Sequence, residues 1–398
     1  MRLSAKRNSD IEALRTVGVM FVLIGHSLQM FGSLPALEAL LNLFNGSFAV
    51  DLFFAMSGYM ITRGLLPSLQ GAYRDGRHWQ VVRAFWVRRM FRLWPLAWFW
   101  LMVILMLSLF WNKSGAFYSF ETNVAATIAG ALQFANIRLA LAWAESFGYG
   151  ASFVYWSLSL EEQFYFVLPL ILVLFRRKYV WIFVAIFFYQ VWQVRDIWHF
   201  FFRTDAMALG CLLAVVHVRK GMILEPARRF FIGLPRSLLW VFFLSLMLLM
   251  SYFSAAGRVT YFVGVIAVLV NVLILAASFE SNLLAPNAAA EKIFIWVGER
   301  TYAIYLIHVP VYYMIREFWH RFGGEDYTSL HVAAHYMAAA VLIAVFAELS
   351  FRFVETPFRR LGNSLSAQLL NRDSAPVAQH DSINTDPEAD KRRSRLTV

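Results

Sequence analysis

The chain has 398 residues, of which 60% are hydrophobic and only 15% are charged. A soluble globular domain carries about 25% charged residues, so this composition excludes an ordinary soluble domain and favours a protein that spans a lipid bilayer. The net charge of +11 would be compatible with binding to nucleic acid. Basic loops in a membrane protein are topology signals, however, so we expect the lipid bilayer and no nucleic acid as a partner.

Ten apolar segments are candidates for membrane-spanning helices, which need about 20 mostly apolar residues each. In chain order they are 13–31, 48–66, 94–111, 155–175, 180–198, 204–218, 238–253, 259–279, 294–315 and 332–353. The predicted fold class is therefore all-α: a polytopic membrane protein of about ten transmembrane helices.

The stretch 120–143 is ambiguous, because its apolar run is interrupted by Asn123, Gln133, Asn136 and Arg138. It fits an eleventh span, or an additional interfacial or re-entrant segment. If it does not cross, the basic clusters at 83–92, 176–178, 219–229 and 359–360 all fall on one face. The positive-inside rule therefore favours ten spans, with both termini in the cytoplasm and the protein in the inner (plasma) membrane.

The chain divides into three parts by composition. Residues 1–12 are predicted to be a cytoplasmic N-terminus, and residues 13–360 a single transmembrane domain. Residues 361–398 are polar and lack hydrophobic periodicity, so we predict a disordered cytoplasmic tail.

The first predicted helix carries two ionisable residues, Arg15 and His26. Eleven helical steps leave a net rotation of about 20°, so the two side chains share one face and lie about 16 Å apart along the axis. Each residue alone also fits a purely structural role: Arg15 could extend to the lipid headgroups, and His26 could form an interhelical hydrogen bond. Both on one face indicate a functional path, because charged groups within a membrane usually face the protein interior.

Further ionisable residues are predicted to share the outer half of the membrane with His26: Asp51, Glu161, Glu162, Asp205 and His308. Each acid alone also fits an interhelical hydrogen bond. Together they predict a polar cavity open to the outside. A histidine beside carboxylates can deprotonate a hydroxyl group, so this group is a candidate catalytic centre.

A separate anion site is predicted at the inner edge of the membrane. Arg89 and Arg92 are three residues apart, so they are neighbours if the segment is helical. Their guanidinium groups can bind phosphate with two hydrogen bonds each, although positive-inside charge alone explains them as well. No HExxH motif or P-loop occurs, and we expect no metal site.

Seven motifs, in order over about residues 11–360, resemble the membrane-bound acyltransferase-3 family. They are Arg15 with His26, Asp51 to Thr62 (DLFFAMSGYMIT), Arg89 with Arg92 before Leu93-Trp94-Pro95, Trp156 to Tyr165 (WSLSLEEQFY), Arg203 to Gly210 (RTDAMALG), Tyr302 to Pro310, and Val354 to Arg359 (VETPFR). The departures are small: Glu12 stands where the family commonly has aspartate, and Met56 lies within the second motif.

The resemblance implies an O-acyltransferase without a bound cofactor. It implies transfer of an acyl group, typically acetyl from acetyl-CoA, to a hydroxyl of a carbohydrate acceptor such as a cell-surface polysaccharide or lipopolysaccharide. Members often carry a C-terminal hydrolase-like domain, and this sequence suggests the stand-alone form. The essential roles of the family's motif residues carry over to Arg15, His26, Arg89 and Arg92.

These observations give one mechanistic hypothesis. Arg89, Arg92 and Arg15 hold the acyl-CoA donor, and His26 acts as general base together with Arg15 and Glu161, with Glu162 as the alternative helper. The acceptor sites are assigned to Asp51, Glu162, Asp205 and His308. A transient acyl-His26 is a variant of this scheme.

Two other function classes fit the sequence less well. One is a transporter or flippase for a lipid-linked or small substrate, and the other is a non-catalytic membrane scaffold. The polar residues do not recur in two related halves, as they do in many transporters. The acceptor, the acyl chain and the oligomeric state have no signature in this sequence.

Overall fold

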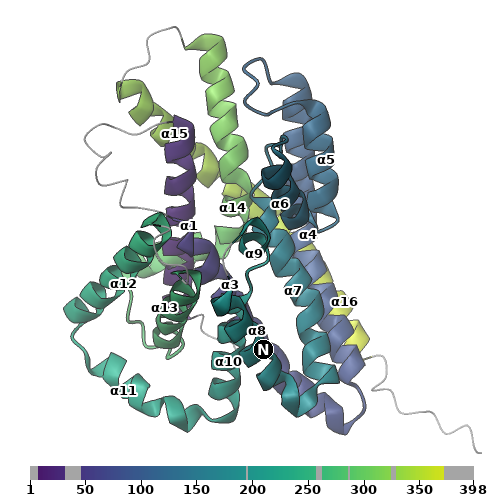
Figure 1. Cartoon of the computed structure of the whole chain (residues 1–398), viewed down its shortest axis with the longest axis vertical. Coiled ribbons are helices and arrows are strands. Elements are labelled where there is room, and N and C mark those ends of the chain that lie inside the picture. Colours follow the sequence, from purple (N-terminus) through teal and green to yellow (C-terminus); the bar gives the residue numbers. More distant parts are fainter. Residues whose placement is uncertain are drawn as a thin grey trace, which may run out of the picture.

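A computed structural model of the chain describes residues 8–31, 46–193, 196–256, 262–285, 287–323 and 329–371, and the description below is confined to these ranges. All regular secondary structure within them is helical (Figure 1). The longer helices are α1 (Ser9–Phe31), α3 (Phe48–Arg74), α4 (His78–Phe110), α7 (Tyr155–Leu174), α8 (Tyr179–Trp192), α10 (Asp205–Arg219), α12 (Arg236–Ala256), α13 (Phe262–Ala277), α14 (Ala288–Phe322), α15 (Ser329–Ser350) and α16 (Thr356–Asn371).

The predicted membrane class is confirmed, because six helical segments are long and apolar enough to cross a bilayer. They are Ser9–Phe31, His78–Phe110, Tyr155–Leu174, Ile197–Arg219, Arg236–Ser254 and His331–Asn371. Each of the ten predicted spans overlaps a helix. The number ten itself stays a prediction.

The ambiguous stretch forms a hairpin of two short helices, α5 (Phe120–Ala131) and α6 (Ala135–Glu145). Neither can cross a bilayer, because 12 and 11 residues span only about 18 Å. The hairpin lies along α4, where the Trp98 indole donates to the Ala131 carbonyl, and its tip is held by α7, where the Gln163 amide donates to the Gln133 carbonyl. This geometry does not fit a single eleventh spanning helix, and the interfacial or re-entrant placement of the segment stays a prediction.

Helices α3 and α10 cross closely. A Cβ atom on Gly58 would collide with the backbone carbonyl of Met207, and one on Gly210 would collide with that of Ala55. Small residues at such a crossing let two backbones approach each other, as is common where membrane helices pack. The crossing fixes α3, which forms one wall of the site, against the rest of the bundle.

Two further pairings frame the interior. Helices α1 and α14 pack together and run in the same direction, since Thr16 donates to the Phe294 carbonyl and His26 contacts His308 further along both helices. Helix α16 packs against α4 (Figure 1). A π-helical turn, Phe351–Glu355, joins α15 to α16.

Helix α16 continues to Asn371, so residues 361–371, which we expected to begin a disordered tail, are helical. The polar composition of this stretch is that of a surface helix whose apolar side packs on α4. Residues 372–398 of the predicted tail lie outside the described part of the chain, as do residues 1–7 of the predicted N-terminus.

Candidate functional site

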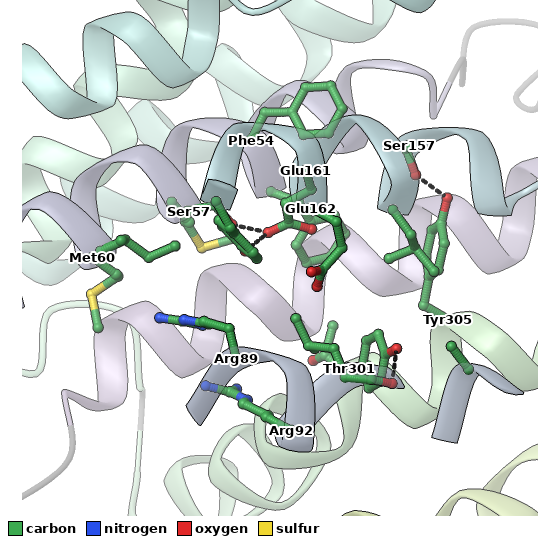
Figure 2. A pocket seen from close by; sticks show the side chains of 18 of the residues that line it. Phe54, Ser57, Met60, Arg89, Arg92, Ser157, Glu161, Glu162, Thr301 and Tyr305 are labelled. Atoms are coloured by element: carbon green, nitrogen blue, oxygen red, sulfur yellow. Dashed lines mark hydrogen bonds between the residues drawn. The ribbon is translucent and has the colours of Figure 1, made fainter. Parts of the chain in front are cut away.

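A cavity of about 230 Å³ lies between α3, α4, α7 and α14, and Arg15 of α1 reaches it as well. Figure 2 shows Arg89 and Arg92 on one side and Glu161 and Glu162 opposite them. Three of the four residues carried over from the resemblance, the arginines, therefore meet in one space. Arg89 and Arg92 share this face because they are one turn apart on α4, whereas Arg15 reaches it from α1 through helix packing.

The two glutamates are held by different partners. Glu161 accepts hydrogen bonds from the hydroxyls of Ser57 and Tyr165, and the indole of Trp94 donates to Glu162 over 3.3 Å. Both glutamates share the cavity of the arginines and not the space around His26. The predicted division into an outer histidine–carboxylate group and a separate inner arginine site is therefore wrong for Glu161 and Glu162.

The arginines are positioned mainly by aromatic rings and one local ion pair. The Arg89 guanidinium lies 5.6 Å from the ring centre of Phe85 and 5.1 Å from that of Tyr165, within the range of cation–π attraction. Arg15 pairs with Glu12 at 2.9 Å on its own helix. Stacking of this kind orients a guanidinium while leaving its N–H groups free for a ligand.

His26 contacts a second histidine and not a glutamate. Its Nδ1 lies 2.9 Å from Nε2 of the fully buried His308, whose own Nδ1 lies 2.7 Å from the Tyr305 backbone carbonyl. A carbonyl oxygen only accepts hydrogen bonds, so Nδ1 of His308 carries a proton. In a neutral pair, Nε2 of His308 then accepts from Nδ1–H of His26. Nε2 of His26 is thereby left without a proton and can act as a base.

The cavity ends next to this pair. Its lining includes Ser157 and Tyr305, whose hydroxyls lie 2.7 Å apart, but neither His26 nor His308 (Figure 2). Tyr305 is one helical turn before His308, so its side chain borders the cavity while its carbonyl holds the histidine. The base and the arginine-lined space are adjacent along α1 and α14 and are separated by the Ser157–Tyr305 contact.

Two predicted acceptor residues lie elsewhere. Asp51 accepts from Arg203 over 2.8 Å, and both side chains are almost fully buried, at 4% and 2% exposure. Asp205 is buried at the start of α10, where it accepts from the Ala206 amide. Neither aspartate lines the central cavity. The Asp51 contact is that of a buried structural ion pair, and a substrate role for either residue stays a prediction.

Several cavity residues were not singled out from the sequence: Ser57, Trp94, Ser157, Tyr165 and Tyr305. Two of them could have been found from their spacing in the sequence. Tyr165 is four residues after Glu161, and Tyr305 is three before His308, which places each on the same helix face as its charged neighbour. Ser57 and Trp94 come from other helices, so only the packing reveals them.

The helical fold and the charged groups inside it define an integral membrane protein with a polar site within its spanning helices. The chain belongs to the acyltransferase-3 family: the family model described as an acyltransferase domain matches residues 8–349.

Curated relatives carry related names. A Staphylococcus aureus (strain COL) protein with a provisional O-acetyltransferase name is 27% identical over 376 residues, covering 88% of this chain and 57% of that protein. The O-acetyltransferase OatA of S. aureus (strain MRSA252) is 25% identical over 350 residues, covering 83% of this chain and 55% of OatA. The chain thus spans little more than half the length of the curated relatives it matches. No solved structure matches it.

Proposed function

We propose that the protein is an integral membrane O-acyltransferase that moves an acyl group, typically acetyl, from acyl-CoA to a hydroxyl of a carbohydrate or glycolipid acceptor. One observation carries the proposal: a cavity lined by Arg15, Arg89 and Arg92 ends, at Ser157 and Tyr305, next to a histidine pair whose hydrogen bonds leave one nitrogen free as a base. Family membership and the O-acetyltransferase names of the relatives support it.

The donor enters on the arginine side. Guanidinium groups bind phosphate through two hydrogen bonds each, so Arg89 and Arg92 hold the diphosphate of acyl-CoA. The pantetheine arm then extends through the cavity towards Ser157 and Tyr305, a distance of about 12 Å along α4 from Arg89 to Ala97. Arg15, on the same face of α1 as His26, helps to hold the donor along this path.

The transfer itself needs one base. Nε2 of His26 takes the proton of the acceptor hydroxyl while the hydroxyl oxygen attacks the thioester carbonyl. The carbon–sulfur bond breaks, the acyl group forms an ester, and the coenzyme A thiolate leaves and is reprotonated. A two-step route through acyl-His26 has the same balance, with the imidazole as the first acceptor.

The basic loops support an orientation with both termini in the cytoplasm of a cell whose inner (plasma) membrane holds the protein. Acyl-CoA then reaches the arginines from the cytoplasm. The acceptor is a glycan or glycolipid at the opposite, outer side of the membrane, and its hydroxyl reaches His26 from that side.

The experiment is acyl transfer by the purified protein in nanodiscs, with acetyl-CoA as donor and a surface-glycan extract of the host as acceptor. Replacing His26 by Ala removes the base, and we expect transfer to fall by about 10²–10⁴-fold. His199→Ala is the matched control, because His199 pairs with Asp196 and does not line the cavity. Mass spectrometry of the glycans gives the mass of the acyl group.

Substantial transfer by folded His26→Ala protein would overturn the assignment of the base. Movement of a lipid-linked glycan across proteoliposomes without any acyl-CoA consumption would instead favour the transporter alternative.

A further inference from the structure

A second cavity, of about 390 Å³, lies between α3, α4 and α16. Its polar lining consists of Ser68, Arg88, Arg89, Arg92, Arg359 and Asn363, and no carboxylate lines it. A space bordered by four guanidinium groups has a strongly positive potential. Its natural ligand is therefore an anion.

The charge in this cavity is only partly compensated by the protein, by one buried carboxylate, Glu355, which attracts both Arg92 and Arg359 from outside the cavity lining. Within the described ranges, Arg88, Arg89 and Arg92 form no ion pair with a carboxylate, and Arg359 has Glu355 only at 3.8 Å. Nε of Arg92 is buried and has no hydrogen-bond partner. Positive-inside loop charge normally faces water or lipid headgroups. A buried N–H without a partner, in a wall between two cavities, points instead to a ligand that supplies the partner.

The two cavities are adjacent. They share Met60, Ile61, Arg89 and Arg92, so the arginine pair stands at their junction. Figure 2 shows Arg89 and Arg92 projecting side by side below the glutamates of the central cavity. A ligand whose phosphates sit at this junction extends in one direction towards the histidines and in the other towards Arg88 and Arg359.

Helix packing places Arg359 there. A Cβ atom on Gly362 would collide with the Phe91 side chain, so this glycine lets α16 lie directly on α4. Arg359 and Asn363 flank Gly362, one turn before it and one residue after it, and both border the cavity. The side chains of Arg88 and Arg359 thus face one space from two helices.

We propose that this second cavity binds the nucleotide end of the donor, with Arg88 and Arg359 as ligands of a phosphomonoester separate from the diphosphate held by Arg89 and Arg92. This inference rests on the proposed function and sharpens its donor: the site recognises an adenosine 3′,5′-bisphosphate group and not merely a thioester. A phosphomonoester carries about −1.5 to −2 charges at pH 7, which complements the surplus of guanidinium groups.

Binding of two small nucleotides tests the inference without relying on catalysis. The full chain in phosphatidylcholine nanodiscs is titrated with adenosine 3′,5′-bisphosphate and with adenosine 5′-monophosphate. We expect the bisphosphate to bind about 10- to 100-fold more tightly, as is typical for charge-assisted hydrogen bonds. Arg359→Gln should reduce this ratio to about two-fold, and Arg88→Gln, a second variant on another helix, should do the same.

Arg360→Gln is the matched control, because Arg360 is exposed next to Arg359 and does not line the cavity. It should keep the wild-type ratio. Equal affinities of wild-type protein for the two nucleotides would overturn the inference. So would a ratio that survives both arginine variants in folded protein.

Phosphate chemistry also occurs in lipid headgroups, so the titration is repeated in nanodiscs that contain phosphatidylglycerol. A ratio that persists there supports the nucleotide. A ratio abolished by phosphatidylglycerol would assign the cavity to a headgroup and overturn the inference. Acetyl transfer is measured separately: nucleotide discrimination without transfer would refute the proposed function alone, and transfer without discrimination would refute only this inference.

Discussion

The His26–His308 contact differs from the usual base-and-carboxylate pair. His308 is neutral when it accepts from His26, so it adds no negative charge to stabilise an imidazolium. Its contribution is orientation: the Tyr305 carbonyl fixes the proton of His308, and His308 in turn fixes the tautomer and the ring plane of His26. His308 is therefore a positioning residue and His26 the proposed base.

Replacing His308 by Leu removes the acceptor for Nδ1–H of His26 while filling similar space. We expect kcat to fall by about 10²-fold or more with little change in KM for acetyl-CoA, because a misoriented base costs rate and not donor binding. Steady-state kinetics at several pH values measure this, and His308→Gln, whose side-chain oxygen can accept the same hydrogen bond, should recover part of the loss.

Tyr312→Phe serves as the control for that experiment. It removes the Tyr312 hydroxyl, which donates to the Leu23 carbonyl between the same two helices and also contacts Ser27, and it keeps the ring that contacts His308. A kcat of the His308→Leu variant within two-fold of the control would show that the contact has no positioning role.

The charged residues of the site divide into those that the sequence predicts and those that it does not. The spacing of residues along one helix follows directly from the sequence. The proximity of Arg89 to Arg92 and the shared face of Arg15 and His26 could therefore be predicted. The partner of His26 could not, because it depends on how α14 packs against α1. Glu161 and Glu162 were assigned by depth alone, and depth does not tell which of two neighbouring spaces a side chain enters.

At the level of helices, the α3–α10 crossing depends on the absence of side-chain atoms. Gly58 faces the backbone of α10 at Met207, and Gly210 faces the backbone of α3 at Ala55, so each helix fills the space that a Cβ atom would occupy on the other. Between membrane helices the attraction is mainly close packing, and it falls off quickly with separation. A single methyl group at this crossing should therefore matter more than elsewhere on α3.

Gly58→Ala and Gly71→Ala are a matched pair on this one helix. Both gain about 1 kcal/mol of helix propensity, but the methyl group added at position 58 meets the Met207 backbone, whereas Gly71 is exposed with open space around it. We expect the midpoint of thermal unfolding in detergent to fall for Gly58→Ala and to stay or rise for Gly71→Ala. Equal midpoints would contradict the close crossing.

The α5–α6 hairpin shows what a broken apolar run can indicate. The residues that made 120–143 ambiguous include those that hold it in place: Asn123 donates to the Ser119 and Phe117 carbonyls and accepts from the Ala151 amide, and Asn136 contacts Gln163. Irregular backbone at membrane depth is tolerated only when protein groups satisfy it. The polar interruptions alone left the segment ambiguous between an eleventh span and an interfacial or re-entrant segment, and its partners on α7 depend on the packing.

At the level of the whole molecule, the orientation in the membrane can be tested with single cysteines, because the one native cysteine, Cys211, is buried. Lys113, Glu145 and Arg177 are exposed and lie before the hairpin, after it and beyond α7. We expect a membrane-impermeant maleimide to label Lys113→Cys and Glu145→Cys on intact cells, and Arg177→Cys only after permeabilisation.

Wild-type protein with Cys211 alone should stay unlabelled in both conditions. Labelling of Arg177→Cys on intact cells would reverse the orientation. Protection of Glu145→Cys with labelling of Lys113→Cys would mean that the segment between them crosses the membrane after all.

The placement of Arg15 and His26 on one helix also restricts how this part of the chain can change in length. One residue inserted between them would turn their side chains about 100° apart, so that one of the two would leave the path while the other stayed. Insertions before Arg15 or after His26 carry no such penalty. The length of the segment between them therefore sets the distance between Arg15, which helps to hold the donor, and the nitrogen of His26 that receives the proton.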